Sequence, residues 1–344
     1  MRRWVFGLIG PLAVIVAAAT VSSPDRCAVA QDRAVVRTER GGPRLRVVMR
    51  VPTGRQPKSV AVSPDGRRVF VANFGRPDRD NVRVYDAETL EHVGTVEFDG
   101  NAVETAFSPD GSTVYVSNFR RHAIEVIDAA SLTVRGEVVV GGHPKVIELS
   151  PDGRRLYTAN WATERVTEVD ARTLEITRRL STGEHPRGMA VGAGGQRIYV
   201  AAMYSHLIHV FDRGARTERT SFRPCEFPRH LRLSPSGDRL YASCSCCRQV
   251  RWFDTETYRL RGIAQTGENP RSIDLTRDGR WLAVADFDDT TVTLIDTVEG
   301  THRVFPVPDA DQIVGVAVRP TGPLRIYATS WMTAELVVLE PAEP

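Results

Sequence analysis

The chain has 344 residues, of which 42% are hydrophobic and 25% charged, and its formal net charge is +3 at pH 7. The first 30 residues carry three arginines and one aspartate, so the rest of the chain has a net charge of about +1. A nearly neutral chain has no overall field that would attract nucleic acid or a membrane surface. Nucleic acid is therefore disfavoured as a partner, and a site for an anion must come from local clustering of basic residues.

Residues 1–30 have the pattern of a cleaved export signal. A pair of arginines precedes an apolar stretch at residues 4–19, and Ala28-Val29-Ala30 is a small-x-small cleavage site. The apolar stretch is shorter than the roughly 20 residues that span a membrane and contains a proline, which disfavours the alternative of a retained anchor. We expect cleavage after Ala30, no stable membrane span afterwards, a periplasmic or secreted location, and a flexible mature N-terminus at residues 31–44.

A repeat of about 42 residues fills the rest of the chain. Each copy predicts a first strand, a turn such as Ser63-Pro64-Asp65-Gly66, and a second, third and fourth strand. The third strand of a copy usually ends at an aspartate. These aspartates are spaced 42 residues apart: Asp86, Asp128, Asp170, Asp212, Asp254 and Asp296. Several strands in each period of about 40 residues are typical of propeller blades. We predict an all-β fold, a single seven-bladed β-propeller over residues 45–340 with four antiparallel strands per blade, and a tail at 341–344.

The seventh copy supplies only three strands, at residues 314–318, 325–330 and 335–339. By its register with the other copies, Leu45–Val51 is a fourth strand that lacks its own blade. We predict that it pairs with Glu335–Leu339 and closes the last blade. Closure covers the edges that an open array of strands would expose to other chains, so we also expect a monomer.

The second strand of the repeat carries a recognisable motif, as in Val114-Tyr115-Val116-Ser117-Asn118. On this motif the chain resembles the YVTN family of β-propeller repeats, and the resemblance covers residues ~45–340. It implies a seven-bladed propeller of the group that includes lactonase-like and cytochrome d1-like propellers. It implies no single activity.

One position of the repeat is basic in five of seven copies. It lies five residues before the Ser-Pro-Asp-Gly turn, near the start of the first strand, and is occupied by Lys58, Val103, Lys145, Arg187, Arg229, Arg271 and Val314. Because the repeats are related by rotation, we expect these side chains to form a positive ring at the mouth of the central channel. Such a ring suits a carboxylate or phosphate ligand. The alternative is a solvated consensus residue that bonds a neighbouring blade.

Three histidines belong to the predicted ligand-binding face. His143 and His185 lie two residues before the basic position in neighbouring repeats, and His230 directly follows Arg229. Imidazoles can bind a metal or act as acid and base near neutral pH. The alternative for His143 and His185 is a hydrogen bond to a loop backbone.

Aromatic residues follow the second strand in five repeats. They are Phe74, Phe119, Trp161, Phe287 and Trp331. We expect these rings to wedge between blades more than to stack on a ligand.

The fifth repeat contains all the cysteines that remain after signal cleavage: Cys225, Cys244, Cys246 and Cys247. In an oxidising compartment, Cys225 can form a disulfide with Cys244 or Cys246. Alternatively Cys244, Cys246 and Cys247 with His230 are soft ligands that would suit copper or zinc. Inert thiols are the third alternative, and a complete metal motif with distant ligand pairs is missing.

These observations favour a binding module with a basic face for an anionic small molecule, a cell-envelope component or another protein. The first alternative is a lactonase-like hydrolase that uses His143, His185, His230 and Arg187. The second is a metal- or redox-associated propeller based on the cysteine cluster. The attachment motif of c-type haem, Cys-x-x-Cys-His, is absent from the sequence.

Overall fold

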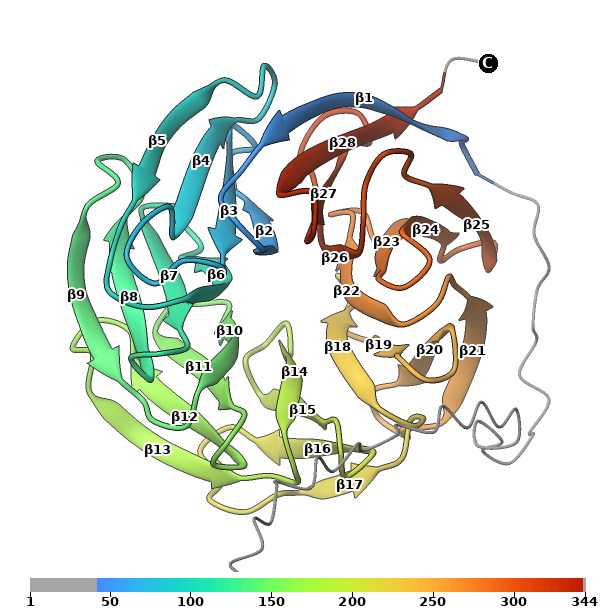
Figure 1. The fold of residues 1–344 in the computed structure, drawn as a ribbon. Helices are drawn as coiled ribbons and strands as arrows, with labels where there is room; N and C mark the ends of the chain where they lie inside the picture. Colours follow the sequence, from blue (N-terminus) through green and yellow to red (C-terminus); the bar gives the residue numbers. More distant parts are fainter. Residues whose placement is uncertain (1–41, 343–344) are drawn as a thin grey trace, which may run out of the picture.

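The computed structural model describes residues 42–342. In this part of the chain, 28 β-strands form seven four-stranded antiparallel sheets arranged as blades around a central channel (Figure 1). The sequence prediction of a seven-bladed all-β propeller is confirmed. Within these residues no helix has the length and apolar character needed to cross a membrane. The predicted export signal at residues 1–30 lies outside the described residues.

The strands of the first six blades follow in chain order from the channel outwards. Blade one contains β2 (Pro57–Val62), β3 (Arg68–Asn73), β4 (Val82–Asp86) and β5 (His92–Val96). Blade two contains β6 (Ala102–Phe107), β7 (Thr113–Asn118), β8 (Ala123–Asp128) and β9 (Val134–Val139). Blade three contains β10 (Pro144–Leu149), β11 (Arg155–Asn160), β12 (Arg165–Asp170) and β13 (Ile176–Ser181).

The next three blades keep this order, although the outer strand of blade four is short. Blade four contains β14 (Pro186–Val191), β15 (Arg197–Ala202), β16 (Leu207–Asp212) and β17 (Thr220–Phe222). Blade five contains β18 (Pro228–Leu233), β19 (Arg239–Cys244), β20 (Gln249–Asp254) and β21 (Leu260–Gln265). Blade six contains β22 (Pro270–Leu275), β23 (Trp281–Asp286), β24 (Thr291–Asp296) and β25 (Thr301–Pro306).

Blade seven is built from both ends of the described chain. It contains β26 (Ile313–Val318), β27 (Ile326–Ser330), β28 (Glu335–Pro341) and, as its outer strand, β1 (Leu45–Pro52). Strand β1 pairs with β28 in antiparallel register. Leu45 lies opposite Pro341 at one end and Pro52 opposite Glu335 at the other, with one irregularity between Val47 and Met49. The predicted closure of the last blade by the N-terminal strand is therefore confirmed.

The apolar core lies between neighbouring blades. Phe70 and Val82 of blade one, for example, pack against Val114 and Ile127 of blade two, and all four side chains are fully buried. The middle strands are buried on both faces because each face meets a neighbouring blade, whereas several residues of the outer strands are exposed. This packing leaves the innermost strands to line the channel.

The repeated turn residues have structural roles. In the first copy, the Ser63 hydroxyl donates to Asp65 Oδ1 at 2.6 Å, which also accepts from the Arg67 amide at 3.0 Å. Gly66 has φ +75°, a conformation that costs glycine little. Turns also follow the six aspartates that are spaced 42 residues apart, which we call the ladder aspartates: Asp86 Oδ1 accepts from the amides of residues 88 and 89, both at 2.9 Å.

Candidate functional site

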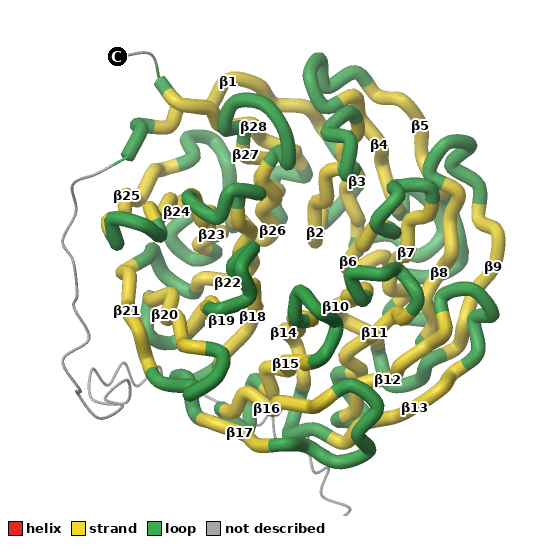
Figure 2. The backbone as a smooth tube through the Cα atoms, turned by 180° about the vertical axis from the view of Figure 1, so that it is seen from behind, coloured by secondary structure: helices red, strands yellow, loops and turns green. Residues whose placement is uncertain are grey.

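The five basic residues of the repeat meet in the channel. They lie on the innermost strands, which surround the channel in both views (Figures 1 and 2). A single cavity of about 50 Å³ is lined by all five, together with Val103 and Val314 from the two remaining blades. We call Lys58, Lys145, Arg187, Arg229 and Arg271 the basic ring. The structure thus brings together the residues that the sequence placed at one repeat position.

No ion pair in the described part of the chain neutralises the basic ring, although Asp288 opposes the lowered pKa values of Arg229 and Arg271 and Glu104 lines the same cavity. Within residues 42–342, no ion pair joins any of its five side chains to a carboxylate. Arg229 is only 8% exposed. A buried cation without a partner loses hydration that nothing replaces, so this arrangement costs folding free energy.

Burial and mutual repulsion act on the protonation of the ring. Desolvation lowers the pKa of Lys145 to about 7, and the nearby charges of Arg187 and Arg229 add to this effect. Desolvation is also the main cause that lowers the pKa of Lys58 well below its usual value, and repulsion from the three arginines and Lys145 adds to it. Burial is likewise the main cause that lowers the pKa of Arg187 to about 10 and that of Arg271 to about 9. An anion in the cavity would relieve both causes.

Aromatic rings support three members of the basic ring. Lys145 Nζ lies 4.1 Å from the ring centroid of Phe119, and Lys58 Nζ lies 4.9 Å from that of Trp331. The guanidinium carbon of Arg271 lies 3.0 Å from the ring centroid of Phe287. Such contacts partly offset the lost hydration and hold the cations in place without neutralising them. The aromatic residues of the repeat therefore position the basic side chains.

His143 and His185 do not line this cavity. Each has Nδ1 at about 3 Å from a loop carbonyl, that of Phe119 and that of Trp161 respectively, and each imidazole stacks on the same residue's ring with centroids 4.2 Å apart. Both residues have a positive φ, near +58° and +53°. Histidine tolerates this conformation better than most residues, and the repeat position requires it. Their placement fits the backbone-bonding alternative that the sequence left open.

His230 does lie in the channel, one residue after Arg229 on β18. Its Nδ1 accepts a hydrogen bond from the Ile273 amide of the next blade at 3.3 Å. Burial, followed by the charge of Arg232, lowers the pKa of His230 well below its usual value. The imidazole is therefore neutral at pH 7 and adds no charge to the basic ring.

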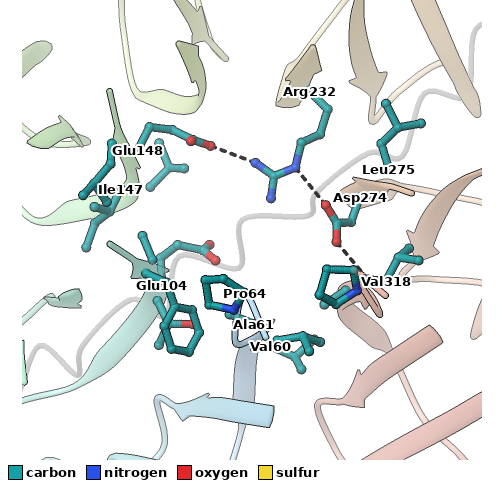
Figure 3. A pocket seen from close by; sticks show the side chains of 18 of the residues that line it. Val60, Ala61, Pro64, Glu104, Ile147, Glu148, Arg232, Asp274, Leu275 and Val318 are labelled. Atoms are coloured by element: carbon teal, nitrogen blue, oxygen red, sulfur yellow. Dashed lines mark hydrogen bonds and ion pairs between the residues drawn. The ribbon is translucent and has the colours of Figure 1, made fainter. Parts of the chain in front are cut away.

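The sequence analysis missed a group of charged residues deeper in the channel. Arg232 donates from Nη1 to Glu148 Oε1 at 2.8 Å and from Nε to Asp274 Oδ1 at 3.1 Å (Figure 3). Asp274 also accepts from the Val318 amide at 2.8 Å, so one ion-pair network links blades three, five, six and seven. The three side chains lie three positions after the basic position in their repeats, where other blades carry alanine. That departure from the repeat was the available signal.

Glu104 separates the basic ring from this network. It lines both the small cavity and a second one of about 480 Å³, into which Glu148, Arg232 and Asp274 point (Figure 3). Desolvation raises the pKa of Glu104 to about 7, against the opposing effect of Arg232. Near pH 7 this carboxyl is therefore protonated in part, which limits how far it can neutralise the ring.

The cysteines form a site of their own beside the channel. Cys225 and Cys244 are joined by a disulfide, and Cys247 packs against them in a buried cluster. Neither cavity of the channel is lined by a cysteine, whereas both are lined by His230. No group of three or more potential metal ligands gathers among residues 42–342. The copper or zinc site at Cys244, Cys246, Cys247 and His230 stays a prediction, and in the disulfide form Cys244 has no thiolate to offer.

Solved structures of other propellers resemble this fold. The Kuenenia stuttgartiensis hydrazine synthase matches with a TM-score of 0.73 and 19% identity, over 83% of this chain and 96% of that chain. The Cps50 (Swd1) β-propeller domain of Myceliophteria thermophila matches with a TM-score of 0.74 and 13% identity, over 87% and 100% of the two chains. At these identities the likeness concerns the fold alone.

Comparison by sequence gives the family. No curated protein matches the chain. The model of the YNCE-like β-propeller family matches residues 10–304, which is most of the chain. This match agrees with the YVTN-type repeats in the sequence and with the seven blades of the structure. The chain belongs to the YNCE-like β-propeller family.

Proposed function

We propose that this protein is an exported binding propeller that holds a small anionic ligand at the basic ring. The observation that carries the proposal is the meeting of five basic side chains in one cavity, with no ion pair between any of them and a carboxylate among the described residues. Repulsion and lost hydration destabilise this arrangement when the cavity contains no anion, and both are relieved when an anion binds. Functional sites are where such unfavourable arrangements are retained.

The remainder of the proposal concerns location and partners. The signal-like residues 1–30 support export to the periplasm or the outside of the cell. The anion would be a free small molecule or an acidic group on a cell-envelope component or protein. Arginine side chains suit either source because their planar groups bind carboxylates and phosphates with two parallel hydrogen bonds.

The double substitution Arg187→Ala with Arg229→Ala tests this proposal. It removes two neighbouring charges from the ring, and we expect the affinity for citrate and for inorganic phosphate to fall at least tenfold, because hydrogen bonds to charged groups contribute about 1.5–3 kcal/mol each. Isothermal titration calorimetry at low salt measures the change. The matched control is Arg67→Ala with Arg154→Ala, which removes the same charge from exposed positions after the repeat turns. Equal affinity in the two double variants would refute a site at the basic ring.

One observation favours a second candidate, the lactonase-like hydrolase. Glu104 lies against the basic ring with its pKa raised to about 7, where a carboxyl can serve as a general base or acid. If this function holds, wild-type protein opens sugar lactones and Glu104→Gln loses at least 100-fold in kcat. If wild type shows no turnover of a panel of sugar lactones, the binding function stands alone.

A further inference from the structure

The choice of residues in the basic ring is unusual for this chain. The whole sequence contains 45 lysine and arginine residues, but only two of them are lysine, Lys58 and Lys145. Both lysines occupy the same repeat position and line the same cavity. Arginine keeps its proton at every ordinary pH, whereas a buried lysine can give its proton up. The ring therefore combines three permanent charges with two that can be switched by protonation.

The ring is also asymmetric. Lys145, Arg187, Arg229 and Arg271 come from four successive blades, three to six, and form a continuous arc. Lys58 of blade one lies across the channel from this arc, between Val103 of blade two and Val314 of blade seven. The cations thus approach one small space from two sides, with apolar side chains between them.

We propose that the basic ring binds one compact dianionic oxyanion, a phosphate- or sulfate-type group, and that Lys58 and Lys145 take up protons when it binds. This inference rests on the proposed function and names its ligand class. The group can be a free phosphate or sulfate ion, or the terminal phosphate of a larger molecule that extends out of the channel.

Size and charge favour this ligand class over a carboxylate. The cavity of about 50 Å³ suits a head group of a few atoms, since about 10–15 Å³ of such space holds one water molecule. A single carboxylate carries one negative charge and two oxygens, which leaves most of the arc uncompensated. A phosphate group or a free sulfate ion carries about two charges and at least three oxygens, so it can accept from several arginines at once.

The surroundings of the two lysines explain the proton uptake. Lys145 faces Arg187 and Arg229, while the rings of Phe74, Phe119 and Trp161 lie within 6 Å of its Nζ. The charges of Arg187, Arg229, Arg271 and Lys145 act on Lys58, and Glu104 lines the same cavity. His230 also lines the cavity and is neutral. In the empty protein burial and repulsion disfavour the ammonium forms, and a dianion reverses both effects.

Sulfate is the probe that tests both the binding of a dianion and the uptake of protons, because it keeps its charge of −2 between pH 7 and pH 9. Calorimetric titrations at pH 8 in HEPES and in Tris, whose ionisation enthalpies differ, give the number of protons taken up. We expect uptake of between one and two protons and an affinity at least tenfold higher for sulfate than for acetate. Affinity for sulfate should fall from pH 7 to pH 9, by up to tenfold per pH unit for each lysine that is neutral in the empty protein.

Two variants and two further ligands complete the experiment. Lys145→Arg keeps the charge, so it should retain binding at pH 7 but lose about one proton of uptake at pH 8. Lys145→Met should lose both the binding at pH 7 and the proton uptake at pH 8. A thermal melt of each variant shows that it is folded. The affinities for methyl phosphate and for inorganic phosphate are then compared. The higher of the two shows whether a terminal phosphate group or the free ion is the better ligand.

The outcomes distinguish this inference from the function on which it rests. Acetate binding as tight as sulfate binding, or sulfate binding without proton uptake, overturns the inference and leaves an anion site in place. Failure of sulfate, phosphate, citrate and acetate alike to bind overturns the proposed function as well.

Discussion

Replacing Arg187 and Arg229 together with methionine is expected to raise the melting temperature of the ligand-free protein. Arg229 is buried and Arg187 half-buried, neither forms an ion pair with a carboxylate among the described residues, and desolvation lowers the pKa of each. Because arginine keeps its proton at pH 7, both groups are charged in the folded protein, and their desolvation destabilises the folded state. Methionine is unbranched and uncharged, and its side chain is two atoms shorter than that of arginine. We expect unfolding free energy to increase by about 2 kcal/mol and Tm by roughly 3–6 °C.

Differential scanning calorimetry in a buffer without sulfate, phosphate or other multivalent anions measures this effect. The control, Arg67→Met with Arg154→Met, changes exposed residues and should leave Tm within about 1 °C, as is usual for surface substitutions. Addition of sulfate should raise the Tm of the wild type and leave that of the Arg187/Arg229 variant unchanged. A lower Tm in this variant than in the wild type, with both folded, would contradict an uncompensated basic ring.

Removal of the chain through Pro52 is expected to destroy the single cooperative unfolding transition. This deletion takes away β1, so β28 loses its hydrogen-bonded partner and becomes an exposed edge. It also uncovers a core cluster that holds Leu336 and Val338, against which Met49 and Val51 pack. We expect Tm to fall by roughly 10 °C or more, together with aggregation at the open edge.

The matched control for this deletion begins at residue 42 and keeps β1. It should unfold in one transition close to that of the chain that begins at residue 31. Circular dichroism melts and light scattering on the two truncated proteins measure the difference. If the chain that lacks β1 unfolds as cooperatively as the control, strand β1 does not hold the ring closed.

The fold followed from the sequence because its signal was repeated seven times. The spacing of the ladder aspartates gave the blade length, and the missing fourth strand of the last copy identified Leu45–Val51 as its replacement. The structure adds the cause of the spacing: Asp86 and four of its equivalents accept from two backbone amides in the turn that follows. Asp212 instead bonds Arg219, in the blade whose outer strand is short.

The site was only partly predictable. A position shared by all blades is related by rotation, so the basic residues had to meet at the channel. Whether a side chain points into the channel depends on local backbone conformation, which the repeat did not reveal. The positive φ of His143 and His185 turns these residues towards loop carbonyls instead. Glu104 was missed because it occurs in one blade only; for Arg232 the available signal was the departure from alanine that it shares with Glu148 and Asp274.

Disulfide pairing was left open for a similar reason. Four cysteines allow several pairings, and sequence spacing does not distinguish Cys244 from Cys246 as the partner of Cys225. The choice depends on the register of β18 and β19, in which Cys244 lies opposite Pro228. Only the folded structure gives that register.

The central claim is that the basic ring consists of buried and half-buried cations whose charge is compensated only when an anion binds. The two lysines allow this claim to be tested directly. Reductive methylation with ¹³C-formaldehyde labels Lys58, Lys145 and the N-terminus, and NMR then follows each amine as a function of pH. In buffer without multivalent anions, the account predicts that Lys145 titrates near pH 7 and Lys58 well below its usual range, and that sulfate shifts both upwards. Titration of both lysines near pH 10, with or without sulfate, would contradict it.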